Sequence, residues 1–206
     1  MHIKIDLKIF VFLLLFVLIG QVKIYALLIG FALLHEIGHL IMGVAVGLKP
    51  QEMKMTPVGI SITFQNDVGY YTPNQRMLKE IAVAIAGPLV NIVVVVVCFI
   101  FSFPSSLIWI VNLVLAIINL LPIYPLDGGR IVKSILKRVA TQEEAEDYMY
   151  TISNTMLILL TMVCSIVILY YHNIALIIAI AYLWWIVIKE HKQYHMWKQY
   201  RAQIHK

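Results

Sequence analysis

The stretch His35-Glu36-Ile37-Gly38-His39 has the residue types and spacing needed to bind a metal ion and activate water. On a helix, positions four apart share a face, so both imidazoles can reach one ion. Imidazole is a good zinc ligand, and zinc lowers the pKa of a bound water to about 7. Glu36 follows the first ligand and can take the proton of that water. The motif therefore predicts hydrolytic chemistry at a zinc site with His35 and His39 as metal ligands.

A catalytic zinc site needs a third protein ligand and leaves one position open for water. Asp127 is a candidate, because it is the first acidic residue after position 80. It follows Asn119-Leu120-Leu121-Pro122-Ile123-Tyr124-Pro125-Leu126 and precedes Gly128-Gly129. The two prolines and two glycines are expected to open the helix here. Irregular backbone at membrane depth is tolerated only where protein or a wet cavity satisfies it. The alternative is an ordinary helix end, in which Asp127 caps a helix that starts near Gly129.

These residues lie in a chain whose composition is that of a polytopic membrane protein. Of its 206 residues, 61% are hydrophobic and 13% are charged, whereas a soluble domain carries about a quarter charged residues. Glu36 is the one acidic or basic residue between Ile24 and Leu48, and a charge inside a bilayer is rarely retained without function. A buried His–Glu pair that stiffens a helix bundle is the structural alternative.

Hydropathy predicts an all-α fold of six transmembrane helices, at residues 9–20, 24–46, 81–101, 107–121, 152–171 and 174–188. With six spans, all of the 16 Lys and Arg residues except Lys23 fall on one side. The positive-inside rule then places both termini in the cytoplasm. His39 and Asp127 lie toward the cytoplasmic ends of two spans that run in the same direction, so we expect them at similar depth.

The connection between the second and third spans also contains a strand signal. Apolar residues alternate with Ser61 and Thr63 between Ile60 and Phe64, which is the period of a strand. We expect a small membrane-associated β-hairpin here. Residues 59–64 could hold an extended substrate by β-augmentation, or the hairpin could plug the water path.

Three sequence elements together resemble the site-2 protease family of intramembrane zinc metalloproteases. They are HEIGH at 35–39, AGPLVN at 86–91 and NLLPIYPLDGGR at 119–130. The resemblance covers residues 24–131 and is greatest to a six-span group that includes a sporulation sigma-factor-processing protease. That protease has a CBS domain and other members have a PDZ insertion. This sequence shows neither, so we expect no regulation through those modules.

The resemblance implies roles for individual residues. His35, His39 and Asp127 would bind one zinc ion per chain, Glu36 would act on the water, and Asn119 would assist catalysis near the scissile bond. Asn119 could instead make a hydrogen bond that stabilises its loop. Gly87 and Pro88 are expected to permit close helix packing and a kink rather than to touch substrate.

The implied function is an intramembrane zinc metalloendopeptidase of the cell membrane. Its expected partners are a membrane-tethered protein substrate, the lipid bilayer and a membrane inhibitor or regulator, with no role for nucleic acid. A sigma-factor precursor, an anti-sigma factor and a remnant signal peptide are all open as substrates. We expect a protease domain at 1–190 and a basic, aromatic cytoplasmic tail at 191–206.

Two other functions use the same residues. A membrane metal-binding or transport protein could employ the same ligands, but it should also have polar residues along the outer half of its path. An inactive relative that acts as a binding partner should have lost a His or Glu of the motif, and none is lost here.

Overall fold

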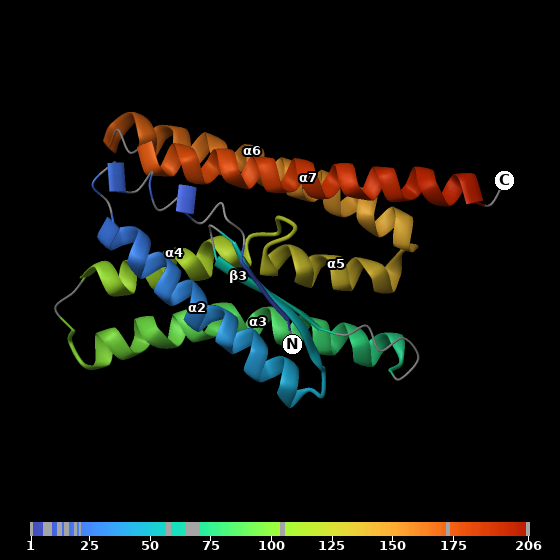
Figure 1. Ribbon diagram of the computed structural model, residues 1–206, viewed down its shortest axis with the longest axis horizontal. Helices are drawn as coiled ribbons and strands as arrows, with labels where there is room; N and C mark the ends of the chain where they lie inside the picture. Colours follow the sequence, from blue (N-terminus) through green and yellow to red (C-terminus); the bar gives the residue numbers. More distant parts are fainter. Residues whose placement is uncertain are drawn as a thin grey trace. The chain divides into compact units, whose positions relative to one another are not determined.

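The computed structural model describes residues 2–5, 10–11, 14, 17–18, 20, 22–56, 59–64, 71–103, 106–171 and 174–204. The chain divides into two compact units, Met1–Leu121 and Pro122–Lys206. Both units are mainly helical (Figure 1). The expected all-α class is therefore confirmed in its coarse form, and half of the residues of the predicted span at 9–20 fall outside the described residues.

The first unit combines three helices with a small sheet. The helices are α2 (Val22–Ala45), α3 (Pro73–Ile100) and α4 (Ser106–Leu120). α2 packs against α3 and α4, and α3 packs along α4 (Figure 1). These helices contain the spans that hydropathy predicts at 24–46, 81–101 and 107–121, with ends that differ by a few residues apart from the earlier start of α3.

The sheet has three strands in the order β1–β2–β3. β2 (Pro50–Thr56) and β3 (Gly59–Phe64) form the antiparallel hairpin expected between the second and third spans, with Met53 opposite Ile62. β1 (His2–Ile5) adds a parallel strand on the other edge of β2, with Ile3 opposite Met53. The sequence analysis did not predict this third strand.

Local sequence signals explain where the helices of this unit begin and end. Gly47 follows the last turn of α2 with φ +81°, a backbone conformation that glycine adopts without steric penalty. Thr72 caps α3: its hydroxyl accepts from the backbone N–H of Gln75, whose side chain accepts from the backbone N–H of Thr72. This capping box, with Pro73 in the first turn, fixes the start of α3.

The second unit consists of α5 (Asp127–Val139), α6 (Gln142–Tyr171) and α7 (Ile174–Ile204). α6 packs against both α5 and α7. The spans predicted at 152–171 and 174–188 fall within α6 and α7. α7 continues as one helix through the expected tail at 191–206 as far as Ile204.

Among the described helices, α2, α3 and α6 are long and apolar enough to cross a membrane, and α4 supplies a shorter apolar helix. Many large apolar side chains are exposed on these helices, including Val93 and Ile100 on α3 and Met162 and Ile166 on α6. Exposed apolar side chains in this number are typical of helices that contact lipid or a protein partner.

Candidate metal centre

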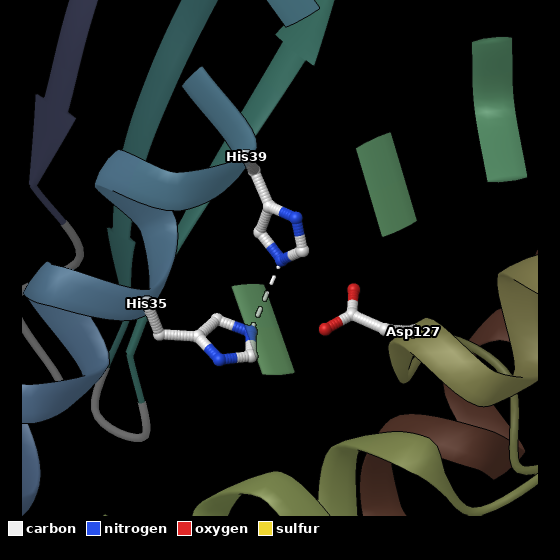
Figure 2. Close-up of side chains that lie close together, drawn as sticks. All are labelled: His35, His39 and Asp127. Carbon is white, nitrogen blue, oxygen red and sulfur yellow. Dashed lines mark hydrogen bonds between the residues drawn. The ribbon is translucent and has the colours of Figure 1, made fainter. Parts of the chain in front are cut away.

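His35 and His39 lie one helical turn apart on α2, and their rings face each other (Figure 2). Their Nε2 atoms are 3.0 Å apart, and the rings meet edge to face with centroids 4.7 Å apart. Both side chains are buried, at 4% and 2% exposure. The i, i+4 spacing of the motif thus brings the two imidazoles together, as the sequence predicts.

The other ring nitrogens contact α3. Nδ1 of His39 lies 2.7 Å from the carbonyl oxygen of Val83, and Nδ1 of His35 lies 2.7 Å from Oδ1 of Asn91. A carbonyl oxygen can only accept, so Nδ1 of His39 must donate the proton. In the neutral ring this leaves the lone pair on Nε2, which is the atom that faces His35.

The facing nitrogens fit a zinc ion. Two lone pairs 3.0 Å apart repel unless a proton or a metal ion lies between them. Two nitrogens bound to a tetrahedral zinc at 2.0–2.1 Å are about 3.3 Å apart. The observed separation is close to this value. The donor set is therefore suited to zinc, and Nδ1–H contacts to oxygen are the usual way in which such ligands are oriented.

Gly87 of α3 keeps space open beside these nitrogens. A Cβ atom at this position would lie 2.5 Å from Nε2 of His35 and 2.5 Å from Nε2 of His39. Gly38 has a related role on α2, where a Cβ would lie 2.9 Å from the carbonyl oxygen of Ala86. The two glycines let α2 and α3 approach closely. The expectation that Gly87 serves packing is therefore incomplete, because Gly87 also lies against the metal-binding atoms.

Glu36 and Asn119 are the other two predicted site residues of the first unit. Glu36 is half-buried on α2, directly after His35. Asn119 is half-buried in the last turn of α4, and its Nδ2 donates to the carbonyl oxygen of Leu115 at 3.0 Å. This bond lies within α4 and not in the loop that follows it, and it leaves Oδ1 as the acceptor end of the amide.

Asp127 belongs to the second unit, where it is the first residue of α5 and is 4% exposed. Leu126 holds the N-cap position and makes no side-chain cap bond. The helix therefore starts at Asp127 and not near Gly129, so Asp127 is not the N-cap. A carboxylate in the first turn is favoured by the helix dipole, and Nη1 of Arg130 lies 3.8 Å from Oδ1 of Asp127.

The loop before Asp127 is anchored within its unit. The backbone N–H of Tyr124 donates to Oγ of Ser153 at 2.9 Å, and the N–H of Leu126 donates to the carbonyl oxygen of Ile123 at 2.8 Å. A Cβ on Gly129 would lie 2.5 Å from the backbone of Ile123. The glycine and the Ser153 contact thus fix the loop against α5 and α6.

A comparison of the sequence with models of known protein families shows which family this chain belongs to. The sequence model for Peptidase family M50 matches residues 23–106 and 103–163, which is most of the chain. The chain belongs to Peptidase family M50. The matched region contains α2, α3 and α4 with the HEIGH motif, and it continues through Asp127 and α5 into α6. The resemblance drawn from three short elements is therefore confirmed.

Similar M50 proteins include a zinc metalloprotease of Methanocaldococcus jannaschii, 30% identical over 67% of this chain and 44% of its own length. Stage IV sporulation protein FB of Bacillus subtilis is 30% identical over 56% of this chain and 41% of its own length. The chain thus spans less than half the length of these relatives. A solved structure, the site-2 protease from M. jannaschii, has the same fold, with a TM-score of 0.69 at 22% identity over 91% of this chain and 89% of that one.

The sequence analysis did not predict the groups that contact the two imidazoles. Asn91 was part of a quoted motif but had no assigned role, and the contributions of Asn112 and the Val83 carbonyl were missed. Asn91 and Asn112 are both fully buried, within apolar stretches of α3 and α4. Polar side chains in such helices are a signal of interhelical bonding or function, and this signal was available in the sequence.

Proposed function

We propose that this M50 protein is an intramembrane zinc metalloendopeptidase, and that His35, His39 and Asp127 hold one zinc ion per chain (Figure 2). The observation that carries the proposal is the facing pair of buried Nε2 atoms on α2, with both Nδ1 atoms already engaged. Two imidazoles, one carboxylate and an open position form a common ligand set for hydrolytic zinc.

We propose Asp127 as the third ligand because its carboxylate can bind zinc and because it is the first acidic residue after position 80. It is a buried carboxylate at the start of a helix, and its loop is fixed by the Ser153 contact. The side chain of Arg130 is 38% exposed, and its Nη1 lies 3.8 Å from Oδ1 of Asp127. The ion pair between these two residues is therefore loose. A buried carboxylate of this kind is stabilised when it binds a cation.

The chemistry follows from the proposed ligands and Glu36. A bound zinc ion would supply a Lewis acid that makes water nucleophilic at neutral pH. Glu36 takes the proton from the attacking water and delivers it to the leaving amine of the cleaved peptide bond. Asn119 is proposed to assist near the scissile bond, where an amide N–H that turns from Leu115 toward substrate would stabilise the developing oxyanion.

We further propose the membrane arrangement that the basic residues favour. The chain would cross the bilayer six times, with both termini in the cytoplasm, and residues 1–190 would form the protease domain. The end of α7 would extend beyond the bilayer as the basic, aromatic tail at 191–206, which suits anionic lipid headgroups. The active site would then lie in the cytoplasmic half of the membrane.

The proposed substrates are membrane-tethered or membrane-associated proteins cut near the cytoplasmic face. The similarity to stage IV sporulation protein FB supports regulated proteolysis, such as processing of a sigma-factor precursor or an anti-sigma factor. A membrane inhibitor or regulator is a further proposed partner. The edge of β3 is available in the described sheet to pair with an extended substrate segment.

The substitution Glu36→Gln tests the catalytic role without removing a proposed ligand. Quantitative proteomics of membranes from cells that carry wild-type or Glu36→Gln protein should show fragments that only the wild type produces. The purified variant should retain the zinc content of the wild type. A metal-transport function predicts instead that metal uptake into vesicles survives Glu36→Gln and that no substrate accumulates uncut; this result would overturn the protease proposal.

A further inference from the structure

His35 begins a chain of hydrogen bonds, here called the relay, that runs from α2 through α3 to α4. Nδ1 of His35 lies 2.7 Å from Oδ1 of Asn91 on α3. Nδ2 of Asn91 donates to Oδ1 of Asn112 on α4 at 2.9 Å. Nδ2 of Asn112 donates to the carbonyl oxygen of Ile108, one turn earlier on α4, at 2.9 Å. Both asparagine side chains are fully buried, so water does not compete for these bonds.

The far end of the chain determines its direction. The carbonyl oxygen of Ile108 can only accept, so Asn112 must present its NH₂ group there and its oxygen to Asn91. Asn91 must then present its NH₂ group to Asn112 and its oxygen to His35. An amide oxygen can only accept, so Nδ1 of His35 must carry the proton. The neutral ring consequently has its lone pair on Nε2.

We propose that Asn91 and Asn112 are positioning residues that hold His35 as the Nδ1–H tautomer and so present its Nε2 lone pair to the metal. The part of this inference that concerns metal rests on the proposed zinc function. Asn112 is needed because the two ends of the Asn91 amide are nearly equal in shape. Without Asn112, Asn91 can turn its NH₂ group toward Nδ1 of His35, which favours a proton on Nε2 and weakens metal binding.

The two imidazoles are therefore oriented by different means. A backbone carbonyl, Val83, fixes the tautomer of His39, and no side-chain substitution removes it. Side chains fix the tautomer of His35. A purely structural role, in which the asparagines only join α2, α3 and α4, predicts no effect on the tautomer. This difference makes the proposal testable.

The experiment uses the full chain in lipid vesicles, with Asn91→Leu and Asn112→Leu as the disrupting variants. Leucine has the same number and branching of side-chain heavy atoms as asparagine but can neither donate nor accept a hydrogen bond. Zinc affinity is measured by competition with a chelator, and loss of such oriented contacts lowers affinity by roughly 10–100-fold. We expect a fall within this range for Asn91→Leu and a fall toward its lower end for Asn112→Leu.

The second readout is the ¹⁵N spectrum of histidine-labelled, metal-free protein, in which protonated and unprotonated ring nitrogens have distinct shifts. The His35 signal is assigned by its loss in His35→Gln. The wild type should show a protonated Nδ1 for His35, and both leucine variants should show a population in which this nitrogen is unprotonated. This readout does not depend on zinc, so it still tests the relay if the wild type binds no metal.

Asn112→Asp supplies the rescue variant. The carboxyl group introduced at this buried position is expected to be protonated, so its O–H can donate to Ile108 and its carbonyl oxygen can accept from Asn91. The variant should restore zinc affinity to within about threefold of the wild type, the context dependence common to single interactions. Asn154→Leu, in α6 and outside the relay, is the matched control and should leave both readouts unchanged.

Each outcome is decisive for the relay. Reduced zinc affinity and mixed tautomers in the leucine variants, with recovery in Asn112→Asp, support it. Wild-type tautomer and affinity in Asn91→Leu overturn it and leave the proposed protease function intact. Lower thermal stability with an unchanged His35 spectrum also overturns it, because that is the signature of helix joining alone.

Discussion

A Cβ atom on Gly87 would lie 2.5 Å from Nε2 of His39, which is well inside the closest approach that real Cβ atoms show. α3 thus has no side chain at the point where the Nε2 atoms of the two imidazoles of α2 meet. The position of Gly87 in the AGPLVN element is explained by this contact rather than by helix propensity, which disfavours glycine within a helix.

Gly87→Ala should therefore displace the imidazoles and lower zinc affinity. Overpacking of a tight site costs about 1–3 kcal/mol, which corresponds to roughly 5–150-fold in affinity. The measurement is chelator competition on purified protein. Gly30→Ala is the matched control, because a Cβ at Gly30 on α2 meets nothing within 4 Å. Equal zinc affinities for Gly87→Ala and the wild type would show that this space is not needed by the metal ligands.

The ion pair between Lys133 on α5 and Glu146 on α6 should stabilise the second unit. Its atoms are 2.7 Å apart at 13% and 17% side-chain exposure, and Nζ of Lys133 also lies 3.9 Å from the ring centre of Tyr124. Lys133→Met leaves Glu146 partly buried without its partner, and we expect a loss of about 1–3 kcal/mol in the free energy of unfolding.

Thermal or denaturant unfolding of the purified protein measures this loss. Lys198→Met is the comparison, because the pairs of Lys198 with Glu143 and Asp147 are more exposed and solvent-exposed pairs contribute little to stability. The double variant Lys133→Met/Glu146→Leu should recover part of the loss, because no buried charge is then left alone. If Lys133→Met and Lys198→Met lowered the free energy of unfolding by the same amount, burial would not make the Lys133–Glu146 pair more stabilising than the exposed pairs of Lys198.

The contact between α6 and α7 should weaken in acid. His191 stacks on Tyr150 with ring centroids 3.4 Å apart. Burial lowers the pKa of His191 below its ordinary value, the charge of His195 lowers it further, and Asp147 acts in the opposite direction. The unfolded chain therefore takes up this proton more readily than the folded chain. Stability is lost as the pH falls through the ordinary value of 6.5 toward the lower folded-state pKa.

His191→Phe keeps a ring against Tyr150 and removes the titrating group. The change in melting temperature between about pH 7.5 and about pH 5.5 should be smaller in His191→Phe than in the wild type, since this is the range in which histidine titrates. Identical pH dependence in the two proteins would mean that His191 does not couple protonation to stability.

Much of this arrangement could be predicted from the sequence because its signals are local. The HEIGH spacing determines that His35 and His39 share a helix face, and Thr72-Pro73 and Gly47 mark helix ends through known capping chemistry. The alternation at 60–64 predicted β3. The parallel pairing of β1 with β2 was not predicted, because strands far apart in sequence give no local signal of their partner.

The surroundings of the two imidazoles depend on tertiary packing and were harder to predict. Asn91, Asn112 and the Val83 carbonyl are far from His35 and His39 in sequence, and only the close approach of α3 to α2 brings them into contact. The alternative in which Asp127 caps a helix that starts near Gly129 is wrong, because α5 begins at Asp127 and Gly129 lies within it, against the backbone of Ile123.

The central claim is that Asp127 joins His35 and His39 in holding one zinc ion. Its most direct test is the zinc content and affinity of purified wild-type, His39→Ala and Asp127→Ala proteins, with the zinc X-ray absorption spectrum of the wild type. We expect about one zinc per chain, bound by two imidazoles and further light atoms, and a large loss of affinity in both variants. Wild-type zinc content and affinity in Asp127→Ala would contradict the assignment of the third ligand.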